Sequence, residues 1–188
     1  MGADLQYAPK RYQRAGTVAR WKPVHLGHAA MLEALCDHAG HVLIGIGSAN
    51  RRDARNPFTA RETADMIEIA LAGRRNFELI EVEDLGDGPR WRDLVTARFG
   101  ALDLFATENA WVRTLLEPVY NVVHPVTLVA AERRVPVDGT MVRRAMARGE
   151  GWEALVPPAV ARYIRDRGLD ARFRREFGLE TLAGELST

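Results

Sequence analysis

The sequence has a single cysteine, Cys36, and it lacks any apolar run long enough to span a bilayer or to form a signal-peptide core. One cysteine excludes a framework of internal disulfides and fits a reducing compartment. The formal net charge is only +1, from 26 basic and 25 acidic side chains, so charge gives no argument for an anionic partner. We therefore expect a cytoplasmic protein that has neither a nucleic acid nor a membrane as its partner.

Three common motifs of nucleotide and ester chemistry are absent as well. The chain contains no Gly-x-x-x-x-Gly-Lys-Ser/Thr, no Gly-x-Gly-x-x-Gly and no Gly-x-Ser-x-Gly. These absences argue against P-loop hydrolases, ordinary dinucleotide dehydrogenases and serine hydrolases. Any phosphate chemistry in this chain has to rest on a different arrangement.

Length and hydrophobic content predict one main domain. A chain of 188 residues that is 47% hydrophobic can bury one good-sized core. Residues 1–14 are polar with scattered aromatics, which favours a flexible N-terminal arm. We place the main domain at 15–168 and expect a partly helical C-terminal tail at 169–188.

Apolar strand patterns alternate with helical patterns along this domain, which is typical of a parallel sheet covered on both faces. Strands are expected at residues 16–19, 41–47, 77–82, 102–106 and 126–130. Helices are expected at 27–38, 59–72, 91–99, 110–116, 141–148 and 158–167. The fold class is therefore α/β, a Rossmann-like doubly wound parallel five-stranded sheet with helices on both faces. In such sheets ligands bind outside the carboxyl ends of the strands.

Two histidines three positions apart, His25 and His28, stand where the first strand turns into the first helix. A helix N-terminus offers unpaired N–H groups and a positive dipole end to an anion, and the two imidazoles can add donors. Gly27 allows a close backbone approach. Surface histidines or half of a metal site are the alternatives, but the sequence provides no further metal ligands beside them. The pattern favours a phosphate site, for a nucleoside triphosphate.

A second helix start carries similar chemistry. Gly139 permits a tight turn, Thr140 can cap the helix or donate to an anion, and Arg143 can grip phosphate oxygens from the first turn. Taken alone, this segment also fits an ordinary helix start with a surface arginine. Two such helix starts in one short chain favour a triphosphate cradle.

Two further residues are candidates for binding a planar group. Trp91 follows a glycine-rich turn, so its indole could stack on a base or a pyridine ring or could simply cover the sheet. Asn109 follows the fourth strand, where its amide could read a base edge or a carboxamide or could cap the next helix. Both alternatives stay open for each residue.

These segments resemble the nucleotidylyltransferase superfamily marked by His-x-Gly-His, and within it the archaeal-type nicotinamide-nucleotide adenylyltransferases. The resemblance extends in order from residue 16 to about 168. The segments that carry it are Arg-Trp-Lys-Pro-Val-His-Leu-Gly-His at 20–28, Gly-Ile-Gly-Ser-Ala at 45–49, Asn-Pro-Phe-Thr-Ala-Arg-Glu at 56–62, Glu-Asp at 83–84 with Trp91, and Gly-Thr-Met-Val-Arg-Arg at 139–144.

The resemblance implies transfer of AMP from ATP to nicotinamide mononucleotide, with Mg²⁺, to give NAD and pyrophosphate. By matching position His25, His28 and Arg143 would be the catalytic residues, and no protein metal ligand is implied. Trp91 and Asn109 would bind the acceptor. The ATP-binding residues would be Arg20, Lys22, Gly27, Gly139 and Thr140. A cytoplasmic homo-oligomer is the usual form of such proteins.

The chain departs from the family pattern at several positions. Ala19 and Lys22 stand where the family usually has Gly and Gln, and Asp138 replaces the Ser before Gly139. Residues 108–110 are Glu-Asn-Ala in place of Gly-Asn-Pro. These changes keep two alternatives open: a transferase of the same fold that uses another phosphorylated acceptor or CTP, and a nucleotide-binding sensor without turnover.

Overall fold

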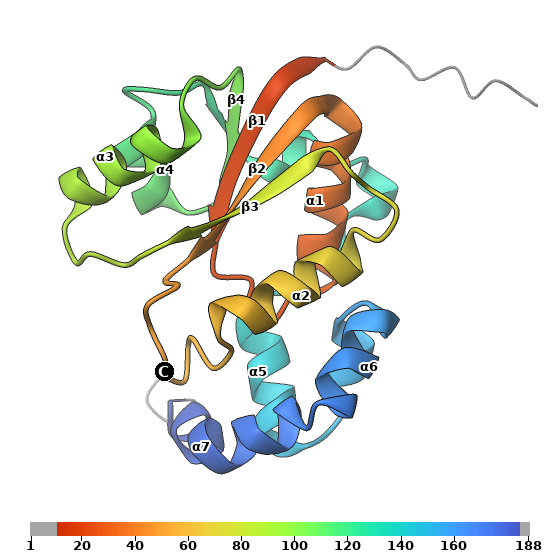
Figure 1. The fold of residues 1–188 in the computed structure, drawn as a ribbon. Helices are drawn as coiled ribbons and strands as arrows, with labels where there is room; N and C mark the ends of the chain where they lie inside the picture. Colours follow the sequence, from red (N-terminus) through yellow and green to blue (C-terminus); the bar gives the residue numbers. More distant parts are fainter. Residues whose placement is uncertain (1–10, 185–188) are drawn as a thin grey trace, which may run out of the picture.

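The sheet has five parallel strands in the order β3-β2-β1-β4-β5, in a computed structural model that describes residues 11–184 (Figure 1). The chain runs outward from β1 to β3 and then returns to pair β4 with the other side of β1. The strands are β1 Tyr12–Ala19, β2 Ala39–Gly47, β3 Phe77–Val82, β4 Leu104–Ala106 and β5 Val122–Val123. The predicted Rossmann-like, doubly wound fold is therefore confirmed, and its strand order reverses between β1 and β4.

Within residues 11–184, seven α-helices follow from local signals in the sequence. They are α1 Leu26–His38, α2 Ala60–Ala70, α3 Gly88–Phe99, α4 Ala110–Leu116, α5 Gly139–Arg148, α6 Pro158–Asp166 and α7 Leu169–Ala183. The predicted capping box is present at the start of α2, because the Thr59 hydroxyl accepts from the Glu62 N–H and the Glu62 carboxylate accepts from the Thr59 N–H. Helix α3 begins three residues before the predicted Trp91, since Asp87 caps it and Pro89 fits its first turn.

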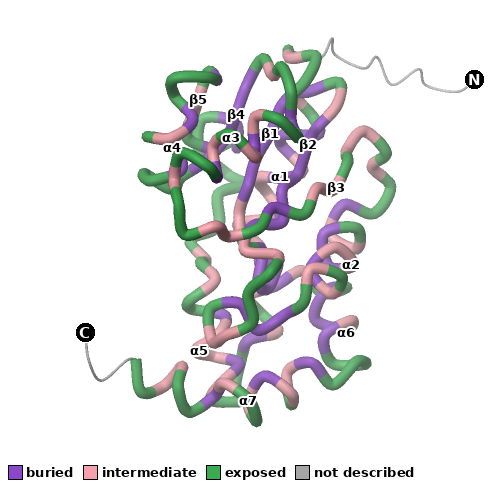
Figure 2. The backbone as a smooth tube through the Cα atoms, turned by 60° about the vertical axis from the view of Figure 1, so that its left-hand side comes forward, coloured by how far each residue is buried: buried purple, intermediate pink, exposed green. Residues whose placement is uncertain are grey.

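Side chains that alternate along β2 divide the interior into two cores. Val42, Ile44 and Ile46 point into the larger core with α1 and α2, whereas Leu43 points into a smaller core with α3 and α4. Figure 2 shows the buried residues concentrated along the strands of the sheet and at intervals along the helices. Helices therefore cover both faces of the sheet, as the alternating pattern predicts.

The fifth strand is not where the sequence pattern placed it. The prediction at 126–130 is wrong, because β5 is Val122–Val123 and Pro125–Thr127 forms a 3₁₀ turn. Pro125 has no N–H for a ladder, and the following N–H groups of Thr127 and Leu128 bond back to residues 124 and 125. The apolar side chains of Leu128 and Val129 are buried by this turn rather than by strand pairing.

The first and last segments also differ in detail from the sequence pattern. Residues 12–14, which were expected in the arm, belong to β1 and pair with β2. The rest of the predicted arm, apart from Arg11, and the last four residues of the tail lie outside the described residues. Across 11–184, no helix combines the length and the apolar character that crossing a membrane requires.

Helices α5, α6 and α7 form a separate layer beyond α2, on the side away from β1 (Figure 1). Val160, Ile164 and Phe173 are buried there and belong to the larger core. The Tyr163 hydroxyl of α6 donates to Asp65 of α2 at 2.7 Å, which ties this layer to the sheet domain. The layer brings the start of α5 to the carboxyl end of β1.

Candidate active site

The turn from β1 to α1 is held by two buried side chains. The Trp21 indole is fully buried, with its backbone at a positive φ of 54°, and its Nε1 donates to the Gly45 carbonyl at 2.7 Å. Lys22 is 2% exposed, and its Nζ donates to the Ser48 carbonyl at 2.8 Å. Burial lowers the pKa of Lys22 to about 8, although the nearby Asp53 carboxylate opposes this shift. Lys22 is therefore cationic at neutral pH.

His25 and His28 stack at the start of α1, with ring centroids 3.5 Å apart. His25 caps the helix, because its Nδ1 accepts from the His28 backbone N–H at 3.2 Å. Burial lowers the pKa of His25 to about 4, and burial with the neighbouring His25 charge lowers the pKa of His28 well below its usual value. Both rings are therefore neutral at pH 7. Since Nδ1 of His25 is an acceptor, its proton lies on Nε2, which is left as a donor.

The start of α5 faces the start of α1. Asp138 caps α5, and its Oδ1 accepts from the N–H groups of Thr140 at 2.7 Å and Met141 at 2.9 Å. The Arg143 guanidinium reaches back across the first turn, donating to the Thr140 hydroxyl at 3.4 Å and to the Lys22 carbonyl at 3.2 Å. Burial and the nearby Arg20 lower the pKa of Arg143 to about 10, so this guanidinium stays charged at neutral pH.

One cavity of about 270 Å³ lies between the two helix starts, at the carboxyl ends of β1 and β4. The sequence-predicted residues that line it are Arg20, Lys22, His25, His28, Asn109, Gly139, Thr140 and Arg143. A cavity lined by both neutral imidazole donors and guanidinium groups can hold a polyanion. The strand-order reversal places this cavity where the fold is expected to bind ligands.

Gly27 and Trp91 are not part of this central cavity. Gly27 lies beside it, where an added Cβ would stand 3.0 Å from the Val137 carbonyl oxygen, so the glycine lets the two helix starts approach closely. Trp91 is 6% exposed, and its ring centroid lies 5.3 Å from that of Trp111. It borders an adjoining cavity of about 310 Å³ that shares Arg20 and Asn109 with the central one.

Asn109 acts as a helix cap in the structure. Its Oδ1 accepts from the N–H groups of Trp111 at 2.9 Å and Val112 at 3.1 Å at the start of α4. The side-chain Nδ2 is not used by the cap. The cap fixes the amide at the boundary between the central and adjoining cavities.

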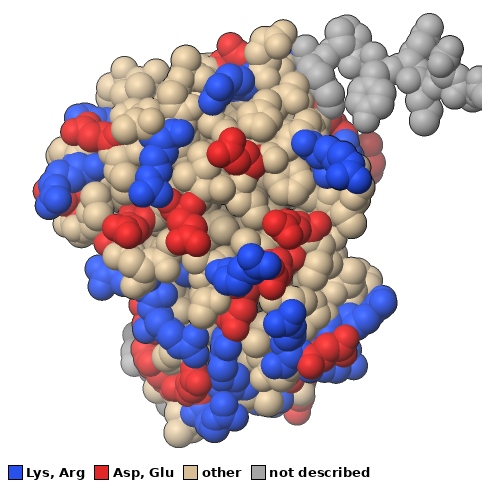
Figure 3. All heavy atoms as spheres, in the orientation of Figure 1, with Lys and Arg blue, Asp and Glu red and all other residues tan. Residues whose placement is uncertain are grey.

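The sequence placed the loop at residues 48–58 near the site, but it singled out neither Arg55 nor α7. A cavity of about 620 Å³ adjoins the central one, and Arg20, Thr140 and Arg143 line both. Arg55 from the loop after β2 lines its other side, together with Glu180 and Gly184 of the C-terminal segment. The Arg-rich composition of the loop could have indicated a role for Arg55 in binding an anion. Nothing in the sequence of α7 indicated that the end of this helix lies beside the cavity. Elsewhere on the face shown in Figure 3, basic and acidic side chains alternate without a large patch of one sign.

The sequence has curated relatives that match most of its length. The Cytidylyltransferase-like family matches residues 17–145. The nicotinamide-nucleotide adenylyltransferase of Picrophilus torridus is 36% identical over 154 residues, which cover 80% of this chain and 89% of the relative. The protein of the same name from Pyrococcus furiosus is 33% identical over 177 residues, which cover 90% of this chain and 92% of the relative.

Solved structures share this arrangement of strands and helices. A bifunctional NMN adenylyltransferase/ADP ribose pyrophosphatase from Francisella tularensis superposes with a TM-score of 0.70 at 16% identity, covering 87% of this chain and 53% of that one. The chain thus spans about half the length of that bifunctional protein. A structure from Vibrio parahaemolyticus, described as a nicotinate-nucleotide adenylyltransferase, gives a TM-score of 0.58 at 17% identity, with 88% and 98% covered. These two likenesses bear on the fold alone. From the family match and the curated relatives, the chain belongs to the Cytidylyltransferase-like family of nucleotidyltransferases, in the group of the nicotinamide-nucleotide adenylyltransferases.

Proposed function

We infer that the protein transfers AMP from ATP to nicotinamide mononucleotide, forming NAD and releasing pyrophosphate. The observation that carries this proposal is the convergence of His25 and His28 with Thr140 and Arg143 on one cavity. The names of the curated relatives support the choice of nucleotide and acceptor. A homo-oligomeric state and a cytoplasmic location stay predictions.

The reaction needs no covalent intermediate and no side-chain base. A phosphate oxygen of the acceptor is already anionic at neutral pH and forms the new bond to the α-phosphorus of ATP in line. The bond from that phosphorus to the oxygen bridging to the β-phosphorus breaks, and pyrophosphate leaves with the electron pair. The protein has to orient the two phosphates and to stabilise the charge that develops on the leaving group.

The donors around the cavity have distinct electrostatic roles in this proposal. His25 offers a neutral Nε2–H donor, and the neutral His28 ring is stacked on it, so neither ring adds charge at pH 7. The positive charge comes from Arg20, Lys22 and Arg143, which all line the cavity. Neutral donors fixed by stacking and capping need little reorganisation as charge builds on an oxygen.

The acceptor would occupy the adjoining cavity that Trp91 borders. A pyridine ring could pack against the Trp91–Trp111 pair, of which Trp111 is 53% exposed, and the Asn109 Nδ2, which the cap does not use, could donate to a carbonyl oxygen. This assignment puts the acceptor phosphate near Arg20, which lines both cavities.

The residues around the cavity fit Mg²⁺ that arrives with ATP. Across residues 11–184, no three His, Cys, Asp or Glu side chains form a group that could hold a metal ion. Mg²⁺ is commonly held by substrate phosphates with one or two carboxylates; of the two carboxylates that line the cavity, Asp138 is engaged in capping α5, so Glu108 is the one that would hold the ion. When bound, Mg²⁺ supplies charge neutralisation on the phosphates.

Incubation with ATP, Mg²⁺ and nicotinamide mononucleotide tests the proposal directly. We expect NAD and pyrophosphate in equal amounts, followed by mass spectrometry and a coupled pyrophosphate assay. Parallel reactions with CTP, and with nicotinate mononucleotide as acceptor, separate the proposed reaction from other transfers on this fold. ATP binding without pyrophosphate release in any of these reactions would favour a nucleotide sensor instead.

Replacing Asp138 by serine, the residue usual in the family, is expected to lower the KM for ATP about three- to tenfold. Serine can still cap α5, whereas the carboxylate places a negative charge in the cavity that receives the polyphosphate. Asp138→Asn is the matched neutral control, and steady-state kinetics at fixed Mg²⁺ provides the measurement. A higher KM in both variants would instead make Asp138 a ligand of the ATP-bound metal.

A further inference from the structure

The loop between β2 and α2, residues 48–58, faces the site with charged side chains. Arg55 lines the 620 Å³ cavity together with Arg20 and Arg143. Burial is the main cause of the lowered pKa of Arg143, and the charge of Arg55 lowers it further. Asp53 acts on Lys22 in the opposite sense, since it partly offsets the lowering by burial. The placement of this loop therefore sets the charge around the phosphate-binding cavity.

The middle of the loop is a compact turn that holds its own shape. The Asp53 carboxylate accepts from the N–H groups of Arg55 at 2.8 Å and Asn56 at 2.9 Å. At its start, the Ser48 carbonyl accepts from Lys22. These bonds shape the turn and fix its beginning, but they do not attach Arg55 or the end of the loop to the layer of α5–α7.

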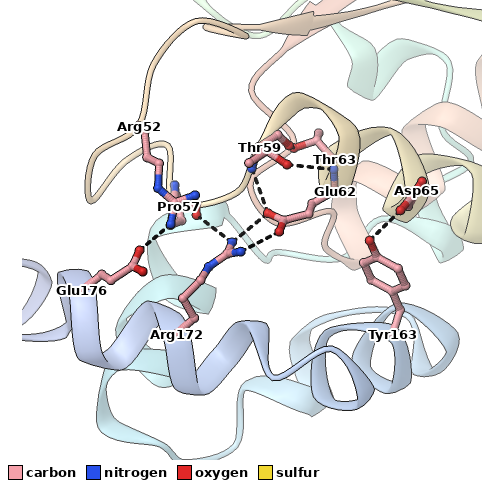
Figure 4. Close-up of polar contacts among 9 residues, drawn as sticks. All are labelled: Arg52, Pro57, Thr59, Glu62, Thr63, Asp65, Tyr163, Arg172 and Glu176. Carbon is pink, nitrogen blue, oxygen red and sulfur yellow. Dashed lines mark hydrogen bonds and ion pairs between the residues drawn. The ribbon is translucent and has the colours of Figure 1, made fainter.

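That attachment comes from Arg172 on α7, which Figure 4 shows between the loop and α2. Its Nη1 donates to Glu62 Oε1 at 2.6 Å, and its Nη2 donates to Glu62 Oε2 at 2.7 Å and to the Pro57 carbonyl at 3.3 Å. The two side chains are about one-fifth exposed, at 22% for Arg172 and 18% for Glu62. A bidentate and largely buried ion pair of this kind fixes the position of α7 relative to α2 better than an exposed ion pair would.

Glu62 connects this ion pair to the loop end through the capping box. The same carboxylate accepts from the Thr59 N–H at 2.9 Å, so one side chain joins α7, the end of the loop and the start of α2. Hydrogen bonds from Arg172 and Thr59 outweigh the effect of burial and lower the pKa of Glu62. The carboxylate is therefore charged at neutral pH and keeps both partners.

A second contact of α7 lies one helical turn further along. Arg52 of the loop forms an ion pair with Glu176 (Figure 4). The Arg52 guanidinium also lies 5.9 Å from the centre of the Phe177 ring. The side chains of this pair are more exposed, at 41% and 34%, so Arg172 is the stronger of the two attachments.

We propose that Arg172 is a positioning residue, which acts through loop 48–58 to hold Arg55 beside Arg20 and Arg143 and so sets the affinity of the site for ATP. This inference rests on the proposed function for the identity of the nucleotide. Arg172 touches no part of the central cavity, so it affects binding only through the loop.

The test compares Arg172→Met and Arg172→Lys with two control variants. Methionine keeps an apolar stem without the guanidinium, whereas lysine keeps one charge but cannot form the two-pronged pair. Arg174→Met removes a neighbouring arginine of α7 that bonds to Asp170 of its own helix and to the Met146 carbonyl of α5, but not to the loop. Tyr163→Phe removes a contact between the α5–α7 layer and α2 that does not involve the loop.

Two measurements separate positioning of the loop from a general loss of stability. The first is the Kd for ATP by calorimetry together with kcat. In Arg172→Met we expect Kd to rise about tenfold, the scale of losing one charge-assisted hydrogen bond, with kcat changed less than about twofold.

The second measurement is limited trypsin digestion, because the loop contains Arg51, Arg52 and Arg55. Cleavage after these residues, identified by mass, should be about tenfold faster in Arg172→Met, partly restored in Arg172→Lys, and unchanged in both controls.

The two measurements also distinguish failure of this inference from failure of the proposed function. Loop cleavage at the wild-type rate in Arg172→Met, or an equal rise in cleavage in Tyr163→Phe, would overturn the positioning role. An unchanged Kd with faster loop cleavage would overturn the link to nucleotide affinity. Wild-type protein that makes no NAD would overturn the proposed function, while the trypsin comparison would still decide whether Arg172 holds the loop.

Discussion

Replacing His28 by alanine is expected to lower kcat about 100-fold or more, the scale seen when a preorganised donor to a developing negative charge is removed. The ring is stacked on His25 and lies edge-on to Trp21, at centroid distances of 3.5 and 4.7 Å. A ring held on two sides keeps one orientation while charge builds on the leaving group. Because the ring is neutral at pH 7, its loss removes a hydrogen-bonding group and no net charge.

The effect should appear in kcat more than in ATP binding. The charges that attract the polyphosphate belong to Arg20, Lys22 and Arg143, and all three remain in the variant. We therefore expect the Kd for ATP to change less than about fivefold, the scale of one neutral hydrogen bond. Calorimetry and single-turnover kinetics give the two quantities.

A matched control removes a histidine that lies outside the site. His41→Ala deletes a partly exposed ring of β2 that lies beside Glu78 of β3, far from the cavity lining. The kcat of this variant should therefore stay at the wild-type value. Folding of both variants is checked by their thermal transitions. A His28→Ala variant with kcat within about threefold of wild type would remove His28 from the proposed mechanism.

The sequence predicts the central cavity well because short-range signals place its residues. His25 and Thr140 each stand at a helix start that follows a strand or a turn, and such positions can be read from a few neighbouring residues. The reversal of strand order then brings the two helix starts together. The prediction of a strand at 126–130 was wrong because Pro125 has no N–H to donate to a strand ladder and starts a 3₁₀ turn instead. A short apolar run does not by itself distinguish a buried strand from a buried turn.

Features that depend on distant contacts could not be read in the same way. Trp91 is buried against Trp111, and this burial follows from how α3 packs on α4. Arg172 and Glu62 are 110 residues apart in the sequence, and nothing local to either one indicates the other. The hydrogen bond from the Lys22 ammonium to the Ser48 carbonyl joins residues 26 positions apart, and neither neighbourhood indicates it, whereas the role of Lys22 in binding phosphate stays a prediction. Such pairings are properties of the packed chain.

Lowering the pH from 7 to 5 is expected to destabilise the fold through His25 and His28, although most carboxylates are still charged in this range. His25 has a pKa of about 4 in the folded protein, whereas an unfolded chain binds the same proton near pH 6.5. Between these values the unfolded state binds more protons, so the free energy of unfolding falls as the pH falls. From pH 7 to pH 5, His25 alone should contribute a loss of about 2 kcal/mol, and His28 shifts in the same direction.

Denaturant unfolding at pH 7 and pH 5 measures this loss, and a variant isolates its source. His25→Asn keeps an oxygen that can cap α1 but cannot take up a proton in this range, so its stability should change about 2 kcal/mol less than wild type between the two pH values. Glu62 has a lowered pKa, so its ion pair with Arg172 weakens only below the pH window used here. If wild type and His25→Asn lose the same stability between pH 7 and pH 5, His25 is not held neutral in the folded protein. A fraction of the His25 imidazoles would then already be protonated near neutral pH, and the leaving group would not meet a uniformly neutral donor.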